Sequence, residues 1–433
     1  MQKLGALTLV AAVWLASSAS ANIDIPGMYD ARSLGMASTG VAFLDSAAGM
    51  PINPALLDQI EDFSFSGNVM LLVAQSKAPY PVTSIAADGQ VVQTAVGQTS
   101  EWLYVPVPFL GGAYRLSEQV VVGLAFSPLA GTGVSQTYRP APDVLPELEV
   151  SYEGGSGLFE ALLSVSWQLV DELALAVTWR PTFVLTGLKQ PTPIPDIPSG
   201  VWVDPKGRPI YNKLELGGYE LLAYQVGLFY RPCSWLQFGA SYRSKVTVEG
   251  EGSLYTDNAE GDGTRTRLEA RQESSFPHSL RVGAALKVLE ERLLFSTDLQ
   301  YHFYSQVYKV NRLEVRSPDG TTQRLETRLN WTNAYSVGLG VEYRLSERIA
   351  VRGGYAYTTS AVPDDYARAG LPAPGAAHQG SVGLGVALFE SINLDLGVSL
   401  SHLSSQVEGT DTNSGQGTYA NDLRQFSVSV TYH

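Results

Sequence analysis

The sequence carries no group of residues arranged for catalysis. A His-Glu-x-x-His motif, a Gly-x-Ser-x-Gly motif, a phosphate-cradling glycine loop and a cysteine pair are all missing from it. The five histidines are scattered, and the one cysteine, Cys233, lies in the predicted turn Arg231-Pro-Cys-Ser234. We therefore expect no enzyme activity, no cofactor and no metal.

Three basic side chains are the best candidates for binding chemistry. Arg243, Lys245 and Arg281 lie on adjacent predicted strands, and the alternation of those strands turns all three to the same, inner side. One interpretation is that they hold a ligand carboxylate, for which arginine offers a bidentate fork. The other, which we favour, is that they pair with carboxylates inside the protein and hold the N-terminal segment through Asp45 or Glu61.

That N-terminal segment is rich in Gly, Ala and Ser, and its apolar residues follow no period. Residues that need burial are Leu34, Met36, Val41, Phe43, Leu44, Met50, Ile52, Leu56 and Leu57. Small residues let backbones approach closely, and irregular backbone is tolerated at membrane depth only where protein surrounds it. We predict that residues 22–61 form a plug, or hatch, and not a loose linker.

Within the hatch, the residues Asn53, Pro54 and Ala55 are predicted to form a turn, because proline fixes its own φ and biases the preceding residue toward extended backbone. Phe43, Leu44 and Ile52 are the candidates for an apolar ligand pocket between hatch and wall.

The first 21 residues read as a secretory signal peptide. An apolar stretch, 4–16, follows Lys3, and Ala19-Ser-Ala21 is a small-x-small cleavage site, so cleavage is expected before Asn22. After Ala21 no apolar run is long enough for a transmembrane helix. The net charge of −13 argues against nucleic acid as a partner. The 7 Trp and 22 Tyr, against 14 Phe, suit contact with membrane lipid at its interfaces.

From residue 62 to 433 the dominant pattern is strict alternation. In 391–401, Ile392, Leu394 and Leu396 share one face, while Asn393 and Asp395 share the other. Apolar residues facing Gly, Ser and Asn are typical of transmembrane strands with the apolar face toward lipid. We predict fourteen strands, at 62–75, 100–115, 119–130, 156–170, 172–188, 217–232, 234–252, 268–288, 291–313, 324–343, 347–362, 377–388, 391–405 and 419–433.

The connections between these strands alternate in length. Short turns fall on one side and longer loops, including 76–99, 131–155 and 189–216, on the other. This is the topology of an outer-membrane barrel with both termini in the periplasm. The loop 189–216 contains several prolines and the apolar residues Ile194, Ile197, Val201, Trp202 and Val203. Those apolar residues either receive a ligand or pack the loop onto the rim. The predicted fold is an all-β, 14-stranded antiparallel transmembrane β-barrel with an N-terminal hatch inside the lumen.

Four stretches, taken in order, resemble the FadL-type outer-membrane transporters of long-chain fatty acids and other hydrophobic compounds. They are Ser33-Leu-Gly-Met-Ala to Asn53-Pro-Ala-Leu-Leu57, 121–133, 230–251, and 333–363. The resemblance covers nearly the whole chain after the signal peptide. It implies a fourteen-stranded barrel in the bacterial outer membrane, a hatch, a ligand bound inside, and release sideways through a kink in the third strand. It also implies recognition by the barrel assembly machinery, which reads a C-terminal aromatic residue; here Tyr432 is penultimate. A monomer is expected.

The third predicted strand contains a feature that fits such a kink. Pro128 removes a hydrogen bond from the ladder, and Ser127 and Gly131 flank it. The alternative is an ordinary strand end. Two functions stay open on the sequence: passive uptake of hydrophobic small molecules, and a structural or adhesive barrel whose outer loops bind a partner. An outer-membrane lipase is disfavoured, because no nucleophile–base pair is visible.

Overall fold

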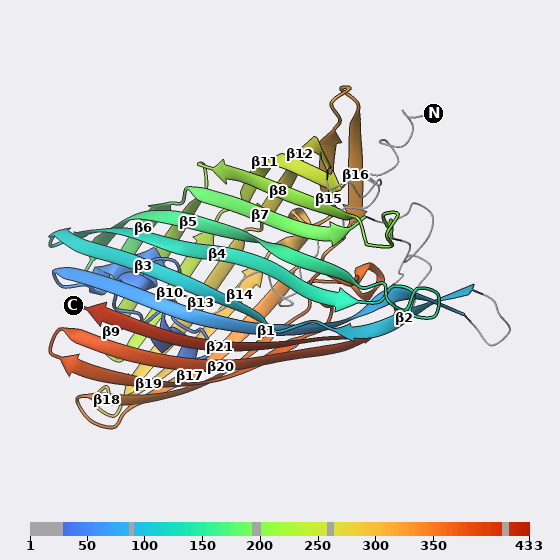
Figure 1. The fold of residues 1–433 in the computed structure, drawn as a ribbon. Coiled ribbons are helices and arrows are strands. Elements are labelled where there is room, and N and C mark those ends of the chain that lie inside the picture. Colours follow the sequence, from blue (N-terminus) through green and yellow to red (C-terminus); the bar gives the residue numbers. More distant parts are fainter. Residues whose placement is uncertain (1–28, 86–90, 193–200, 258–263, 409–414) are drawn as a thin grey trace.

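The protein is a closed antiparallel barrel. The computed structural model describes residues 29–85, 91–192, 201–257, 264–408 and 415–433. Its strand segments follow one another around a ring, and the first, β1 (Phe63–Ile85), pairs with the last, β21 (Gly417–Tyr432), which closes the ring (Figure 1). The signal peptide predicted for residues 1–21 lies outside the described residues.

Twenty-one strand segments make up the described wall. Besides β1 and β21, they are β2 (Val91–Thr99), β3 (Leu103–Ser117), β4 (Val120–Tyr138), β5 (Val150–Val170), β6 (Leu173–Trp179), β7 (Thr182–Pro191), β8 (Tyr211–Glu220), β9 (Tyr224–Cys233), β10 (Leu236–Arg243), β11 (Val246–Asp257), β12 (Arg265–Phe276), β13 (Ser279–Val288), β14 (Leu293–His302), β15 (Val310–Arg316), β16 (Thr322–Arg328), β17 (Ala334–Arg344), β18 (Ile349–Thr358), β19 (Ala377–Phe389) and β20 (Ile392–Val407). The short helical elements are α1 (Ala31–Gly35), η2 (Ala47–Gly49), η3 (Pro54–Gln59), η4 (Tyr304–Gln306) and η5 (Asp364–Tyr366). Among the described residues, no helix is long and apolar enough to cross a membrane.

Seven wall strands consist of two consecutive segments, from β2/β3 through β6/β7 to β16/β17, and the other seven of one segment, so the described wall is a 14-strand barrel. The predicted fold class is therefore confirmed. The predicted loops 76–99 and 131–155 are corrected in part: β1 and β2 form a long hairpin there, and β4 pairs with β5 out to Tyr138. Sustained pairing carries these strands past the point where the apolar alternation fades.

The lower wall has the apolar-out pattern that lipid requires. On β1, Phe65, Val69 and Leu71 are exposed, while Ser66 and Asn68 are buried inside. Exposed apolar side chains recur on other strands around the ring, as at Leu228, Leu339 and Val430. The short turns and the C-terminus lie at one end of the barrel (Figure 1).

In five adjacent wall strands, β8/β9 to β16/β17, the pattern reverses above the apolar-out part of the wall. The outer face there is charged, with Arg271 and Glu251 forming an ion pair at 2.7 Å on β12 and β11. The inner face is apolar and contains Leu214, Leu268 and Leu313. A strand alternates strictly, so it can exchange its faces only where the pleat is interrupted. Each of these strands is interrupted there, as at residues 244–245 and 277–278.

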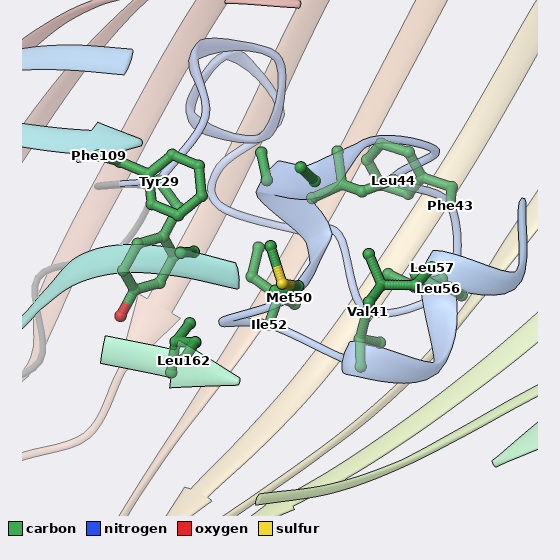
Figure 2. Close-up of a cluster of buried hydrophobic side chains, with 14 of the residues drawn as sticks. Tyr29, Val41, Phe43, Leu44, Met50, Ile52, Leu56, Leu57, Phe109 and Leu162 are labelled. Carbon is green, nitrogen blue, oxygen red and sulfur yellow. The ribbon is translucent and has the colours of Figure 1, made fainter. Parts of the chain in front are cut away.

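The described part of the N-terminal segment, residues 29–62, lies inside the ring of strands (Figure 1). Asp30 caps α1 by accepting from the Ser33 amide, and Asn53 caps η3 by accepting from the Ala55 amide. Leu34, Met36, Met50, Leu56 and Leu57 are fully buried in one cluster with Phe109 and Leu162 of the wall (Figure 2). The segment has no sheet partner, so its packing against the wall holds it.

Glycines on the inner wall allow that packing. A Cβ at Gly239 would lie 1.9 Å from the carbonyl oxygen of Val41, and one at Gly227 would lie 2.3 Å from Oδ1 of Asn53. Backbone of the segment therefore touches backbone of the wall, a contact that only glycine permits.

Candidate functional site

The wall is open between β3 and β4. Their ladder runs from Ser117↔Val120 to Leu110↔Phe126 and stops. Beyond that point the rest of β3, from Phe109 to Leu103, pairs with β1, and the rest of β4 pairs with β5. The two strands therefore separate above this point, and a backbone hydrogen bond from Glu101 to Ser135 joins the two sides again higher up.

The predicted kink residues lie at this separation. Alternation of burial along β4 ends at Ser127, and Ser127, Pro128, Leu129 and Ala130 are all buried. The register of β4 against β5 shifts between Pro128 and Ala130. This irregularity has the form of a bulge, which bends the strand and takes its side chains inward.

Sequence reasoning missed the other edge of the opening. Pro106 and Pro108 lie on β3, opposite Leu71 and Val69 of β1. Proline has no N–H to give to a ladder and suits an edge, so these two residues within the predicted strand 100–115 were the available signal.

An apolar passage of about 290 Å³ occupies the separation. Its lining includes side chains that face the lumen, such as Leu72 and Leu423, and side chains on the outer side, such as Pro108 and Phe159. Phe159 stacks on the exposed ring of Phe126, with 6.0 Å between ring centroids. Because both faces contribute, the passage runs through the wall.

A second cavity, of about 150 Å³, lies in the lumen beside the passage. Both cavities are lined by Gly131, Gly155 and Ser156, so they meet at the bend in β4. The lumen cavity is mixed in character: Leu158, Leu188 and Trp331 line it together with Gln272 and Asn311. Tyr308 and Trp331, whose ring centroids are 4.5 Å apart, form its aromatic side.

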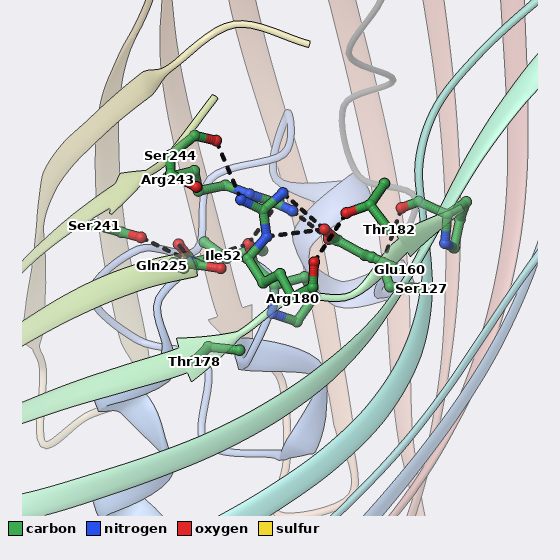
Figure 3. Close-up of polar contacts among 12 residues, drawn as sticks. Ile52, Ser127, Glu160, Thr178, Arg180, Thr182, Gln225, Ser241, Arg243 and Ser244 are labelled. Carbon is green, nitrogen blue, oxygen red and sulfur yellow. Dashed lines mark hydrogen bonds and ion pairs between the residues drawn. The ribbon is translucent and has the colours of Figure 1, made fainter. Parts of the chain in front are cut away.

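A buried ionic cluster lies next to the bend (Figure 3). Glu160 is the β5 partner of Ser127 and pairs with Arg180 at 2.7 Å and with Arg243. Arg180, fully buried, also donates to the carbonyls of Tyr224 and Ser244, which lie at interruptions of two wall strands. The Tyr224 carbonyl also accepts from the Ser244 amide, so Arg180 adds a second hydrogen bond there and satisfies the Ser244 carbonyl at the interruption.

Of the three predicted basic residues, Arg243 and Arg281 line one small cavity of about 20 Å³ with Ile52. Arg243 also donates to the hatch carbonyl of Pro51 at 3.1 Å, and Arg281 donates to Gln300. The expectation that Lys245 points into the lumen is wrong. This residue is exposed on the outer side, where its backbone amide donates to Nδ1 of His278. The interruption at 244–245 exchanges the faces of this strand, so Val246 and Val248 point inward instead.

In the described part of the chain, the predicted carboxylate partners Asp45 and Glu61 do not pair with these basic residues. Asp45 pairs with Arg32 of the same segment at 3.1 Å, and Glu61 is exposed. Among the described residues inside the barrel, Glu160 pairs with Arg243, and Glu342 and Asp395 pair with Arg352. Whether Arg243 and Arg281 also hold a ligand stays a prediction.

The three apolar hatch candidates belong to the packed core. Phe43 is 3% exposed, with the guanidinium of Arg32 5.2 Å above its ring, and Leu44 is 1% exposed. Asn53 donates to the carbonyls of Val41 and Leu228, both at 2.9 Å, and so joins hatch to wall. The described apolar cavities lie higher, at the bend in β4, so ligand contact by Phe43, Leu44 and Ile52 remains a prediction.

A polar cavity of about 640 Å³ lies between the hatch and the periplasmic end of the wall. Arg32 pairs there with Glu342 at 2.8 Å, and Arg352 bridges Glu342 and Asp395. Burial, together with the nearby Asp395 carboxylate, raises the pKa of Asp30 to about 6. This end of the lumen therefore binds the hatch by charge and offers nothing to an apolar ligand.

In the loop 189–216, the predicted residues Val201 and Val203 pack against the upper cluster that contains Tyr138 and Val150. The Trp202 amide donates to Thr192. These contacts agree with the interpretation that the loop packs onto the rim. Ile194 and Ile197 lie outside the described residues.

Comparison with known proteins places these features in context. The model of one family, described as outer membrane protein transport protein (OMPP1/FadL/TodX), matches residues 11–433. A protein of Neisseria meningitidis serogroup B, provisionally named outer membrane protein NMB0088, is 30% identical over 149 residues. That match spans 31% of this chain and 32% of the relative, about a third of each.

Solved structures share the fold at low identity. A FadL homologue of Pseudomonas aeruginosa superposes with a TM-score of 0.74 at 14% identity, over 95% of this chain and 99% of that one. The toluene transporter TodX of Pseudomonas putida gives 0.70 at 17% identity, over 95% and 98%. The CymD monoaromatic hydrocarbon channel gives 0.63 at 15% identity, over 93% and 96%.

Proposed function

This chain belongs to the FadL/TodX family of outer membrane transport proteins, and from that premise we propose that it admits hydrophobic small molecules, long-chain fatty acids or hydrocarbons, and releases them sideways into the membrane. The family is one of transport proteins, so the chain is a transporter of the outer membrane and not an enzyme. The observation that carries the proposal is the apolar passage through the wall between β3 and β4, which meets the lumen cavity at Gly131.

Transfer energetics favour such an exit. Each methylene kept out of water contributes about 0.8 kcal/mol of favourable transfer free energy. An apolar molecule therefore gains no free energy by leaving through the polar cavity at the periplasmic end. Leu72, Val107 and Phe159 line the passage and keep the molecule in apolar surroundings from lumen to bilayer. The toluene and monoaromatic hydrocarbons that the names of TodX and CymD give as their cargo share this need.

Restoring a regular strand tests the exit. Replacement of Pro128-Leu-Ala-Gly131 by Val-Thr-Val-Thr removes the bulge and should let β4 pair with β3, so uptake of radiolabelled toluene or oleate should fall strongly. The matched control places the same four residues further along β4, at 134–137, where pairing with β5 is regular. Heat-modifiable gel mobility checks assembly. Full uptake by a correctly assembled first variant would reject lateral release.

We further propose that the chain is organised as signal peptide 1–21, hatch 22–61 and barrel 62–433, with the hatch blocking the lumen. This proposal is supported by the burial of Leu34, Met36 and Leu57 against the wall. It is also supported by the hydrogen bonds that hatch amides donate to Ser381 and Asp298. Deleting residues 22–53 should leave a folded barrel with raised, unselective conductance in planar bilayers. Unchanged conductance would mean that the segment is no plug.

A further inference from the structure

We propose that a second opening in the wall, between β12/β13 and β14/β15, is the entrance to the lumen cavity, and that it admits hydrophobic molecules from the outer surface of the membrane. The inference rests on the proposed transport function and adds to it where the cargo enters. It concerns the opposite side of the cavity from the passage between β3 and β4.

The ladder between these two wall strands is interrupted. β12 pairs with β15 from Glu269↔Arg316 to Gln272↔Leu313, and pairing resumes at Ser279↔His302 between β13 and β14. One backbone hydrogen bond, donated by the Phe303 amide to the His278 carbonyl, marks the lower margin. Between the margins, five residues (273–277) face nine (304–312). The longer stretch folds inward as η4, where Tyr304 is fully buried, and so leaves the plane of the wall.

The lumen cavity reaches through this interruption. Its lining includes residues from both margins, 272–275 on one strand and 307–312 on the other, apart from Lys309. Glu273 and Arg312 are exposed on the outer face, whereas Leu158 and Trp331, which line the same cavity, are buried inside. A cavity lined from both faces opens to the outside, as the passage at β4 does.

Part of the segment 359–376 packs inside the barrel on the extracellular side of the cavity. Ala361 and Val362 are buried in one cluster with Tyr304 and Trp331, and Ala367 belongs to the upper cluster with Tyr138. Leu371 and Pro372 of the same loop line the cavity. A molecule that approaches along the barrel axis therefore meets these packed side chains before it reaches the cavity.

The height of the opening determines what can use it. Above it the outer face is charged, with Arg271 and Glu269; below it Leu299 and Leu280 are exposed to lipid. It therefore lies at the boundary between membrane and water. Arg312 is already paired with Glu326 at 2.8 Å, and Glu273 adds negative charge beside it. Charges of both signs lie at this edge, Arg312 and Lys309 against Glu326 and Glu273, so it favours neither ion, and the apolar side chains behind it select a hydrophobic molecule.

Tyr308 spans the opening. Its hydroxyl donates to the carbonyl of Ser275 on the far margin, while its ring packs against Trp331 at an interplanar angle of 31°. The ring covers the apolar interior and the hydroxyl satisfies a carbonyl that the ladder leaves without a strand partner. Rotation of this one side chain would widen the opening.

A disulfide across the opening is the direct test, made in the full chain with Cys233→Ser. The variant pair Ser274→Cys and Asn311→Cys continues the inward register beyond Gln272↔Leu313 and should close the opening. The matched control, Gln272→Cys with Leu313→Cys, bridges residues that are already paired. Where oxidation gives no disulfide, dibromobimane supplies a longer bridge; thiol mass-tagging confirms either bridge.

The readout is uptake of radiolabelled toluene by cells that produce each variant, corrected for cells without the chain. We expect bridge closure to remove most of the uptake, reductant to restore it after a disulfide, and the control to match the unbridged protein. Tyr308→Ala should raise uptake. Unchanged uptake in a bridged protein, or in assembled Tyr308→Ala, would overturn the inference. An unbridged protein with no uptake above background would instead refute the proposed transport function.

Discussion

Gly239→Ala isolates the fit between hatch and wall. A Cβ at this position would lie 1.9 Å from the Val41 carbonyl oxygen and 2.6 Å from its carbon, both backbone atoms that no side-chain rotation can move. Ordinary contact begins at 3.4 Å, so the hatch backbone must retreat by about 1.5 Å. One methyl group therefore acts on the hatch alone.

The retreat has a definite energetic cost. Overpacking of this kind costs about 1–3 kcal/mol. The moved backbone also carries the Val41 carbonyl that accepts from Asn53, and the Gly40 and Val41 amides that donate to Asp298 at 3.0 and 3.1 Å. A hydrogen bond from a backbone amide to a carboxylate contributes about 1.5–3 kcal/mol. Losing one of them brings the penalty to at least about 2.5 kcal/mol, which raises the displaced fraction at least roughly seventyfold.

Planar-bilayer recording measures that fraction, because a displaced hatch exposes a water-filled path. Gly239→Ala should show frequent conducting events, whereas the control Gly380→Ala should behave like wild type, since a Cβ there meets nothing within 4 Å. Both variants carry the same glycine-to-alanine change in a wall strand. If an assembled Gly239→Ala protein conducts no more than Gly380→Ala, the wall glycine does not determine how the hatch fits.

Three further perturbations have predictable outcomes. Glu160→Gln removes the carboxylate between two buried arginines and should cost about 3–5 kcal/mol in urea unfolding, whereas Glu149→Gln, in a pair with both side chains 55% exposed, should cost under about 1 kcal/mol. Because burial and Asp395 raise the pKa of Asp30 to about 6 from 3.8, its ionised form destabilises the folded protein at neutral pH, and stability returns as pH falls through 6 toward 3.8. Asp30→Asn should therefore unfold at higher temperature than wild type near pH 8 and match it near pH 4; a constant difference would contradict this. Asn53→Ala loses a helix cap and two bonds to carbonyls and should destabilise the protein by about 1–3 kcal/mol in the same urea assay; no change would mean that water replaces all three.

The barrel was predictable because its signal is local. Alternation such as that of 391–401 places apolar residues on one face without reference to any other part of the chain, and β20 has that pattern. The bend in β4 was predictable for the same reason: Pro128 cannot complete a ladder wherever its neighbours lie. Contacts such as Gly239 with Val41 were not, because they depend on how far the hatch reaches into the lumen.

Lys245 shows where local reasoning fails. Lys245 and Arg243 are two residues apart, so both side chains would point inward on one uninterrupted strand. The sequence gives no strong sign that the pleat is interrupted at Ser244, since neither glycine nor proline occurs there. The cause is remote: the outer face must be apolar where lipid touches it and charged above, as Tyr242 and Glu249 show on the two segments.

The same requirement accounts for the opening between β12/β13 and β14/β15. Each of five neighbouring wall strands must exchange its faces at one height, and each does so with its own number of extra residues. Where neighbours use similar numbers, the ladder resumes at once, as at Arg243↔Ser279 and Val246↔Phe276. Where five residues face nine, the surplus must fold inward, and η4 does so. An entrance at the membrane boundary thus follows from the change of surroundings at that boundary, because the height that forces the exchange of faces is the height at which a hydrophobic molecule passes from water into lipid.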